Sequence, residues 1–364
     1  MKKITFICAT ARSVVLFRKD LIKTLQDKGC EVSVIAFHNE SAEEIEKLGV
    51  QYYPLQGANR SANPFKMLSL KKRYFQILTE IQPDVVFTFM LKPNTFGVLA
   101  AKKAGVKRIY SMVEGIGDAF LNDTLKWKII RALSCSLYKK SLQYAQKVFF
   151  LNQDDQAEFL SRKLVKASQC ELVHGVGVDL TRFTYKPMQN HTTFLMVARM
   201  LKTKGVFEYC EAAREVKKKY SNSRCLYVGS QDGLTTADIQ SYIDDKSVEY
   251  LGEQKDVRPY LEECTVHVLP THGEGFGLVN AEAGAIGRPS ITCNVNGARD
   301  TVVDGYNGFL IEKGDVRALV EKMCWCIENP RETEQMGKNS RLMTENKFDR
   351  AKINQTICQV LGIE

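Results

Sequence analysis

The sequence contains no run of about 18 apolar residues, the length that a membrane-spanning helix needs. Met1-Lys2-Lys3 leads directly into ITFICAT, which predicts a strand and is too short for the apolar segment of a secretory signal. None of the 11 cysteines forms a Cys-x-x-Cys pair, so we interpret them as reduced thiols and expect no metal site among them. Low-complexity tracts and short repeats are also missing. Together these absences indicate a globular protein of the cytoplasm.

The whole chain has a net formal charge of +9, and the positive charge is concentrated in its first half. Residues 1–185 contain 28 Lys and Arg against 17 Asp and Glu, whereas residues 186–364 contain 23 against 25. A basic half predicts an anionic partner, either nucleic acid or a membrane surface, although a solvated basic surface would have the same composition. The sequence shows no recognition motif of the common nucleic-acid-binding modules, so we expect no nucleic-acid partner.

Short apolar segments alternate with helical patterns along the whole chain. Runs such as EVSVIAF and PDVVFTF predict strands that are buried on both faces of a parallel sheet. Helices are predicted from Phe17 to Lys28, from Asn63-Pro64 to about Ile81, and from Thr95 to Ala104. The alternation predicts an α/β fold with two doubly wound Rossmann-like domains that face a cleft.

The domain boundary is predicted within residues 174–187, which are rich in glycine and turn residues. We assign residues 1–183 to a first Rossmann-like domain and residues 184–346 to a second. An amphipathic helix in residues 347–364 is expected to pack back toward the first domain.

Two glutamates, Glu274 and Glu282, lie in THGEGFGLVNAEA with seven residues between them. The glycines around Glu274 predict a loop where backbone amides approach a ligand, and Glu282 falls on one face of a helix that begins near Phe276. A helix N-terminus attracts phosphate, and carboxylates accept hydrogen bonds from hydroxyls. Nucleotide sugars carry both groups. The preceding run VHVLPT places this loop at the end of a buried strand, where open α/β sheets bind ligands.

Two cations follow another predicted strand, in VARMLKTKG. Arg199 and Lys204 lie just past its end, in a loop that Gly205 closes. A guanidinium and an ammonium at this position can neutralise a diphosphate. The same residues would also suit an ordinary solvated loop, but their place in the domain that carries the glutamate pair favours a function.

The combination resembles the retaining glycosyltransferases of family 4, which have the GT-B fold. The resemblance covers nearly the whole chain, with landmarks in HGVGVDLTRF, VARMLKTKG, VHVLPTHGEGFGLVNAEA and GARDTVVDGYNGFLI. In the first half, ANRSANPFKML, KPNTFGVLAAKKAGV and MVEGIGDAF are similar to bacterial transferases that extend polyprenyl-diphosphate-linked oligosaccharides, N-acetylgalactosaminyltransferases among them.

The resemblance implies roles for four charged residues of the second half. Arg199 and Lys204 would hold the donor diphosphate and stabilise the departing nucleotide, and Glu274 would contact hydroxyls of the donor sugar. Glu282 would bind the ribose hydroxyls. The chain has no Asp-x-Asp, the metal signature of the other major transferase fold, so no metal or other cofactor is implied.

Uncharged positions around these residues would complete the donor site. Gly275, Phe276 and Gly277 would line it, the last two through backbone amides, and Leu251 would lie near the nucleobase. Retention of anomeric configuration would come from front-face attack, with the leaving phosphate taking the acceptor proton.

The first half departs from the family pattern at the acceptor side. Many relatives place a histidine near the reacting centre, whereas MVEGIGD offers Glu114 and Gly115 there. Glu114 would contact the acceptor or the transferring sugar, or else the segment is a structural loop whose glycines serve only turn geometry. The first loop, CATARSVVLFR, lacks the usual glycine pair, and Arg12 and Ser13 would line the cleft instead. In the turn between the halves, His174 replaces the asparagine of many relatives.

The segment DTLKWKIIRALSCSLYKKSLQYA predicts a helix that is both apolar and basic. We expect it to dock on the anionic inner face of the plasma membrane, where a lipid-linked acceptor lies, although the apolar face can equally pack on the sheet. The residues expected to share that face are Trp127, Ile130, Leu133, Leu137 and Tyr144.

The sequence therefore predicts a peripheral, metal-independent transferase that moves a sugar from a UDP-sugar to a polyprenyl-diphosphate-linked sugar. N-acetylgalactosamine in α-1,3 linkage, for glycan, O-antigen or capsule assembly, is the expected specificity. Two alternatives stay open: a UDP-N-acetylglucosamine 2-epimerase-like enzyme and a non-catalytic nucleotide-sugar-binding subunit.

Overall fold

The computed structural model describes residues 1–38, 41–56, 64–117, 120, 124–189 and 191–363. Its internal contacts divide the chain into unit 1, residues 1–173 with 352–364, and unit 2, residues 174–351. The division falls ahead of the turn-rich stretch in which we predicted the boundary. This stretch belongs to unit 2 because it pairs with the end of that unit: the Val178 N–H donates to Phe348 O at 2.7 Å, and the Arg350 N–H donates to Val178 O at 3.0 Å.

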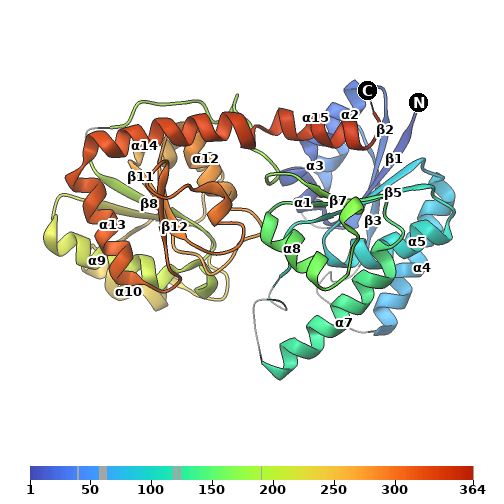
Figure 1. Ribbon diagram of the computed structural model, residues 1–364, viewed down its shortest axis with the longest axis horizontal. Helices are drawn as coiled ribbons and strands as arrows, with labels where there is room; N and C mark the ends of the chain where they lie inside the picture. The colour runs from blue at the N-terminus through green and yellow to red at the C-terminus, as the bar shows by residue number, and fades with distance from the viewer. Residues whose placement is uncertain (39–40, 57–63, 118–119, 121–123, 190, 364) are drawn as a thin grey trace. The chain divides into compact units, whose positions relative to one another are not determined.

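In the described part of unit 1, seven strands form one parallel sheet in the order β3-β2-β1-β4-β5-β6-β7 (Figure 1). The strands predicted from the sequence are present, and the short β7 at the edge of the sheet was missed because its three residues carry no apolar run. The strands are β1 (Lys3–Thr10), β2 (Glu31–Phe37), β3 (Gln51–Leu55), β4 (Val85–Phe89), β5 (Arg108–Val113), β6 (Lys147–Phe150) and β7 (Cys170–Leu172).

The helices of unit 1 differ from the sequence prediction in two places. The helix predicted over Phe17–Lys28 is confirmed as α2, which begins two residues later and ends one residue earlier. The separate helix α1 ahead of it was missed, because CATARSVVLFR was interpreted as a loop, and the two helices meet at Arg18, whose side chain is buried. The helix predicted from Thr95 begins earlier, as a π-helical turn η1. The predicted start at Asn63 lies outside the described residues. The helices are α1 (Ala11–Phe17), α2 (Lys19–Asp27), α3 (Ala42–Glu46), α4 (Pro64–Ile81), η1 (Pro93–Gly97), α5 (Val98–Lys103), α7 (Leu125–Leu142), α8 (Gln153–Ser161) and the 3-10 turn η2 (Ala167–Gln169).

Unit 2 repeats the same architecture, with a parallel sheet of six strands in the residues that the structure describes, in the order β10-β9-β8-β11-β12-β13. The strands are β8 (Thr193–Val197), β9 (Arg224–Val228), β10 (Glu249–Tyr250), β11 (Val266–Leu269), β12 (Ser290–Cys293) and β13 (Gly308–Ile311).

The helices of unit 2 surround this sheet (Figure 1). The helix predicted to begin near Phe276 begins two residues later, after Gly277. The last helix of the chain, α15, begins in unit 2 and runs into unit 1, where Leu361 O accepts from Arg108. The helices are η3 (Lys202–Lys204), α9 (Val206–Lys219), α10 (Thr236–Asp244), α11 (Arg258–Glu263), α12 (Leu278–Ile286), η4 (Arg299–Thr301), α13 (Val316–Glu328), α14 (Pro330–Met343), η5 (Thr344–Phe348) and α15 (Arg350–Val360).

Both sheets are doubly wound, because the strand order reverses in the middle of each. The reversal lies between β1 and β4 in unit 1 and between β8 and β11 in unit 2. Crossovers on the two sides of such a point place helices on opposite faces, and the loops after its two strands diverge to leave a crevice. The fold therefore predicts where each unit binds a ligand.

Helix α7 presents its apolar residues on two different sides. Trp127 and Ile130 line a cavity of about 310 Å³, as predicted for a face that packs inward. Leu133 was wrongly placed on that face, because its side chain is 62% exposed and continues an outer row. We call this row, Leu125, Ile129 and Leu133, the α7 stripe. No helix in the described chain is long and apolar enough to cross a membrane.

Candidate active site

The pair formed by Lys204 and Glu274 lies at the reversal point of unit 2, where the fold predicts a crevice. Lys204 follows β8 and Glu274 follows β11, the two strands at which the order reverses. The Lys204 ammonium donates to both carboxylate oxygens of Glu274 at 2.7 Å. The side chains are only 19% and 14% exposed, so solvent screens this pair weakly. The structure thus brings together two residues that the sequence placed in separate loops.

Close backbone contacts hold these two loops at a fixed distance. Gly205 has a φ of +75°, and a Cβ there would lie 2.0 Å from Pro270 O, so only glycine fits. On the other side, the His272 N–H donates to Thr203 O at 2.9 Å. The glycine that closes VARMLKTKG is therefore what allows Lys204 to reach the loop after β11.

Arg199 lies nearby in the chain but makes a different contact. Its guanidinium pairs with Asp232, in the loop after β9, and the two side chains are 55% and 36% exposed. An exposed pair of this kind contributes little to stability and is readily exchanged for another anion. Asp232 was not singled out from the sequence, although the glycine-framed run VGSQDG after a buried strand was a signal for it.

Glu282 on α12 has an unusual protonation equilibrium. Burial raises its pKa from 4.5 to about 7, and the nearby guanidinium groups of Arg350 and Arg182 only partly offset this effect. Arg350 is itself fixed by donating to Gly177 O at 3.0 and 3.1 Å. Neither arginine was identified from the sequence, because they come from the turn and from the end of unit 2 rather than from the motif.

The amides of the GEGFG loop differ in their availability to a ligand. The Gly277 N–H donates to Gly297 O at 3.1 Å, so it already has a partner, whereas the Phe276 N–H has none in the described part of the chain. The Leu251 N–H continues the sheet by donating to Tyr227 O at 2.9 Å. Gly275 lies between Glu274 and Phe276 on the same crevice-side loop. The donor contacts expected of these four residues stay predictions.

A buried polar network fixes the start of α12. His267 on β11 contacts Asn280 through Nδ1 and Oδ1 at 3.0 Å, and the Asn280 amide donates to Thr301 at 3.0 Å. Burial lowers the pKa of His267 to about 4, so the imidazole is neutral near pH 7. The network ties β11, α12 and η4 together beneath the glutamate loop, and it holds Glu274 and Glu282 in register.

A second group of candidate residues lies in unit 1. Glu114 follows β5 and pairs with Arg18, whose guanidinium stacks 4.3 Å from the ring centroid of Phe89. Arg18 was not singled out from the sequence, where it stands at the start of the helix predicted over Phe17–Lys28. Ser13 takes part in the capping of α1 by Thr10: the Ser13 N–H donates to the Thr10 hydroxyl at 3.2 Å, and the Ser13 hydroxyl donates to Thr10 O at 2.7 Å.

The other two unit 1 candidates, Arg12 and Gly115, lie on the same edge of the sheet. Arg12 is in the first turn of α1 beside Ser13, and Gly115 follows Glu114 on the wall of the cavity that α7 borders. Over the described residues, no three His, Cys, Asp or Glu side chains are arranged to hold a metal ion.

Comparisons with known proteins match both halves of the chain. The family model of glycosyl transferases group 1 matches residues 179–343, and that of glycosyl transferase 4-like proteins matches residues 3–152. The capsular polysaccharide biosynthesis glycosyltransferase CapM of Staphylococcus aureus is 35% identical over 95% of this chain and 93% of its own. An N,N'-diacetylbacillosaminyl-diphospho-undecaprenol alpha-1,3-N-acetylgalactosaminyltransferase of Campylobacter jejuni is 28% identical over 93% of each chain.

Solved structures share the fold over nearly the full length. A glycosyltransferase from Rickettsia africae superposes with a TM-score of 0.82, covering 99% of this chain and 97% of its own at 19% identity. HepE from Anabaena, solved in complex with UDP, superposes with a TM-score of 0.81 over all of both chains at 19% identity. The chain therefore belongs to the group 1 glycosyltransferases, with an amino-terminal half of the family 4-like type.

Proposed function

We propose that this enzyme transfers N-acetylgalactosamine from its UDP-sugar to a polyprenyl-diphosphate-linked sugar, with retention and in α-1,3 linkage. The observation that carries the proposal is the Lys204–Glu274 pair, in which a cation and a carboxylate from two neighbouring strand ends meet at hydrogen-bond distance. The name of the similar Campylobacter jejuni protein supports a lipid-linked acceptor, and that of the Staphylococcus aureus protein supports a role in polysaccharide synthesis.

The residues of the crevice suit the departure of a nucleotide diphosphate. Negative charge grows on the β-phosphate as the bond from the anomeric carbon to oxygen breaks, and Lys204 and Arg199 are placed to stabilise it. Glu274 accepts hydrogen bonds from the sugar, and Glu282 accepts them from the ribose. The acceptor hydroxyl attacks from the same face, and its proton passes to the departing phosphate oxygen.

Metal independence is part of the proposal. Two cationic side chains at the end of β8 supply the positive charge that a divalent ion supplies elsewhere. Turnover should accordingly persist in EDTA at the rate measured in its absence.

We also propose peripheral binding to the anionic cytoplasmic face of the membrane. The α7 stripe supports this, because Leu125, Ile129 and Leu133 are 76%, 55% and 62% exposed and stand beside Lys126 and Lys128. Exposed apolar side chains beside lysines suit the boundary between headgroups and acyl chains. Flotation with liposomes should recover the protein with anionic vesicles; equal recovery with neutral vesicles would contradict the electrostatic part.

The deciding experiment is a donor screen read by mass spectrometry. The purified protein is incubated with each common UDP-sugar and a short-chain polyprenyl-diphosphate-linked N-acetylhexosamine, with EDTA present. Product formed from UDP-N-acetylgalactosamine alone supports the full proposal, and product from another donor rejects the sugar assignment. An epimerised UDP-sugar without transfer would identify an epimerase, and UDP binding without any reaction would identify a binding subunit.

A further inference from the structure

His272 lies two residues before Glu274 in the loop of residues 270–277, which joins β11 to α12. Its Nε2 is 2.7 Å from Oε1 of Glu208, in the first turn of α9. An ionised carboxylate can only accept a hydrogen bond, so the imidazole donates to it through Nε2–H. Both side chains are partly buried, and water therefore competes weakly for the bond. The loop that carries Glu274 is thus attached to α9 by a side chain.

Helix α9 is a firm anchor for this bond. Val206, Tyr209 and Cys210, on either side of Glu208, are fully buried in the core of unit 2. The Tyr209 hydroxyl also donates to Leu226 O on β9 at 2.9 Å. Glu208 is the third residue of α9, where the positive end of the helix favours a carboxylate. The anchor therefore cannot move without disturbing the core.

The backbone of the same residue is attached to the segment that carries Lys204. The His272 N–H donates to Thr203 O at 2.9 Å, and the Thr271 hydroxyl donates to the same oxygen at 3.2 Å. Thr203 directly precedes Lys204. His272 consequently joins the loop to two elements, one through its main chain and the other through its imidazole.

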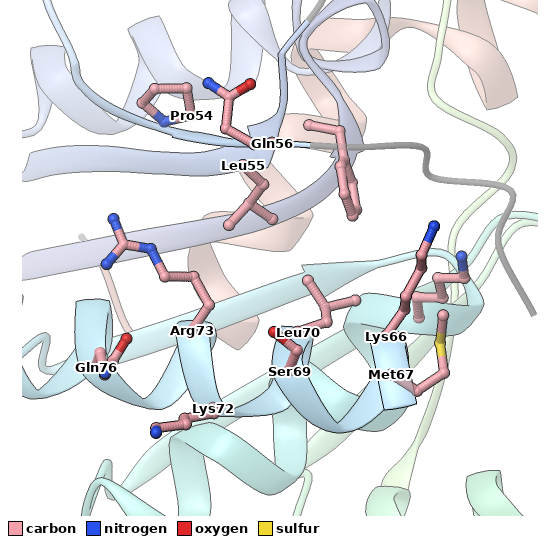
Figure 2. A pocket seen from close by; sticks show the side chains of 12 residues that line it. Pro54, Leu55, Gln56, Lys66, Met67, Ser69, Leu70, Lys72, Arg73 and Gln76 are labelled. Atoms are coloured by element: carbon pink, nitrogen blue, oxygen red, sulfur yellow. The ribbon is translucent and has the colours of Figure 1, made fainter. Parts of the chain in front are cut away.

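Cationic side chains of this protein differ in how they are held. Lys66, Lys72 and Arg73 extend from α4 along a groove of about 580 Å³ in unit 1, and within the described chain they form no ion pair (Figure 2). Lys204, by contrast, donates to both carboxylate oxygens of Glu274, so the position of each side chain depends on the other. A donor diphosphate would take some of the hydrogen bonds of Lys204, and the carboxylate would then need a second restraint.

We propose that His272 is a positioning residue for the transfer reaction: its bond to Glu208 holds the loop of Glu274 in place while the donor is bound. The inference rests on the proposed function for the role of Glu274, and it adds a residue that makes no contact with the substrates. The restraint acts on the sugar contact rather than on the diphosphate. Its loss should therefore lower kcat and spare the affinity for UDP.

Substitutions at both ends of the bond test its effect on turnover. His272→Phe keeps a ring but donates no hydrogen bond, and it should lower kcat about tenfold while the Kd for UDP, measured by calorimetry, stays unchanged. His272→Gln should keep most of the rate, because its amide nitrogen can donate from the same place along the side chain. Glu208→Ala should match His272→Phe, and the double variant should lose no more than either single one. Losses that multiply in the double variant would overturn the proposal.

Tyr242→Phe is the matched control. The Tyr242 hydroxyl donates to Glu211 on α9 at 3.0 Å, three residues beyond Glu208, so this variant also removes one hydrogen bond to a carboxylate of the helix. It should lower the stability of unit 2 as His272→Phe does and leave kcat unchanged. A tenfold loss of kcat in Tyr242→Phe would overturn the proposal, because the effect would then belong to α9 rather than to the loop.

Hydrogen exchange read by mass spectrometry, with saturating UDP present, tests the restraint without turnover. Amides of residues 271–277 should exchange about tenfold faster in His272→Phe and Glu208→Ala than in the wild type, His272→Gln or Tyr242→Phe. Unchanged exchange in His272→Phe would overturn the proposal, and so would faster exchange with a wild-type kcat. Faster exchange in variants of a protein that transfers no sugar would support the restraint and reject the proposed function.

Discussion

Substituting Glu282 by glutamine should stabilise unit 2 at alkaline pH. The pKa of the carboxyl is raised from 4.5 to about 7, so between these values the folded state keeps a proton that the unfolded chain has released. Stability contributed by this group therefore falls as pH rises through that window and reaches its minimum above pH 7. At about 1.4 kcal/mol per pKa unit, the cost is roughly 3 kcal/mol at pH 8 and below about 1 kcal/mol at pH 5. Glutamine has nearly the same shape and no charge, so it removes this cost.

The two tryptophans of the chain make the measurement specific to unit 2. Trp127 lies on α7 in unit 1 and Trp325 on α13 in unit 2, so a Trp127→Phe background leaves fluorescence that reports unit 2 alone. Urea titrations with and without Glu282→Gln, at pH 5 and pH 8, give the free energies of unfolding. A gain of the same size at both pH values, or no gain at pH 8, would refute the reasoning.

The same substitution should weaken binding of the donor. The ribose hydroxyls donate to the ionised carboxylate in the proposed complex, so the affinity of the wild type for a UDP-sugar should fall about tenfold per pH unit below pH 7. Glu282→Gln should bind more weakly at pH 8 and show no such slope. A variant that is more stable and binds less well would mean that the buried carboxylate is retained for function at the expense of stability.

Three other perturbations test the donor crevice. Glu274→Gln should lower kcat roughly a hundredfold while affinity for UDP holds, because the sugar contact is lost and the ammonium beside it stays available; a parallel loss of UDP affinity would contradict this. Asp232→Asn should release Arg199 and raise the affinity for UDP up to about fivefold in low salt, an effect that should vanish in high salt. Gly205→Ala should destabilise unit 2 by more than about 2 kcal/mol in the fluorescence titration, whereas Gly314→Ala, at a similar φ but in open space, should cost about 1 kcal/mol.

The strands and the strand-end residues were predictable from the sequence because both depend on local patterns. Buried runs of Val, Ile and Phe marked the central strands, and Arg199, Lys204 and Glu274 were predicted at the ends of two strands of one domain, the ends that parallel strands bring to one edge. The partners of these residues were harder to predict from the sequence. Asp232 and Arg350 belong to segments that lie near the site only because of tertiary packing, and a local sequence pattern does not indicate such packing.

Side-chain burial was the second quantity that local patterns did not supply. An arginine at a helix end is usually solvated, yet Arg18, which lies between α1 and α2, is 3% exposed and pairs with Glu114. The prediction that the apolar residues of α7 share one face was wrong for a related reason. Its apolar residues are spread around the helix, so the sequence alone could not decide that Trp127 faces the cavity and Leu133 the exterior.

In the proposed donor site, the Lys204–Glu274 pair sets a carboxylate next to the cation that would bind phosphate, and this arrangement has a physical rationale. A lone ammonium in a partly buried crevice would lose hydration and change its position when the diphosphate departs. Held by two carboxylate oxygens at 2.7 Å, Lys204 stays fixed, and its three N–H donors can be shared between Glu274 and a phosphate oxygen. The carboxylate weakens the attraction for the ground-state diphosphate but leaves the cation in place as charge develops on the leaving group. Because rate depends on the difference between those two interactions, a pre-positioned and partly neutralised lysine favours turnover over tight donor binding.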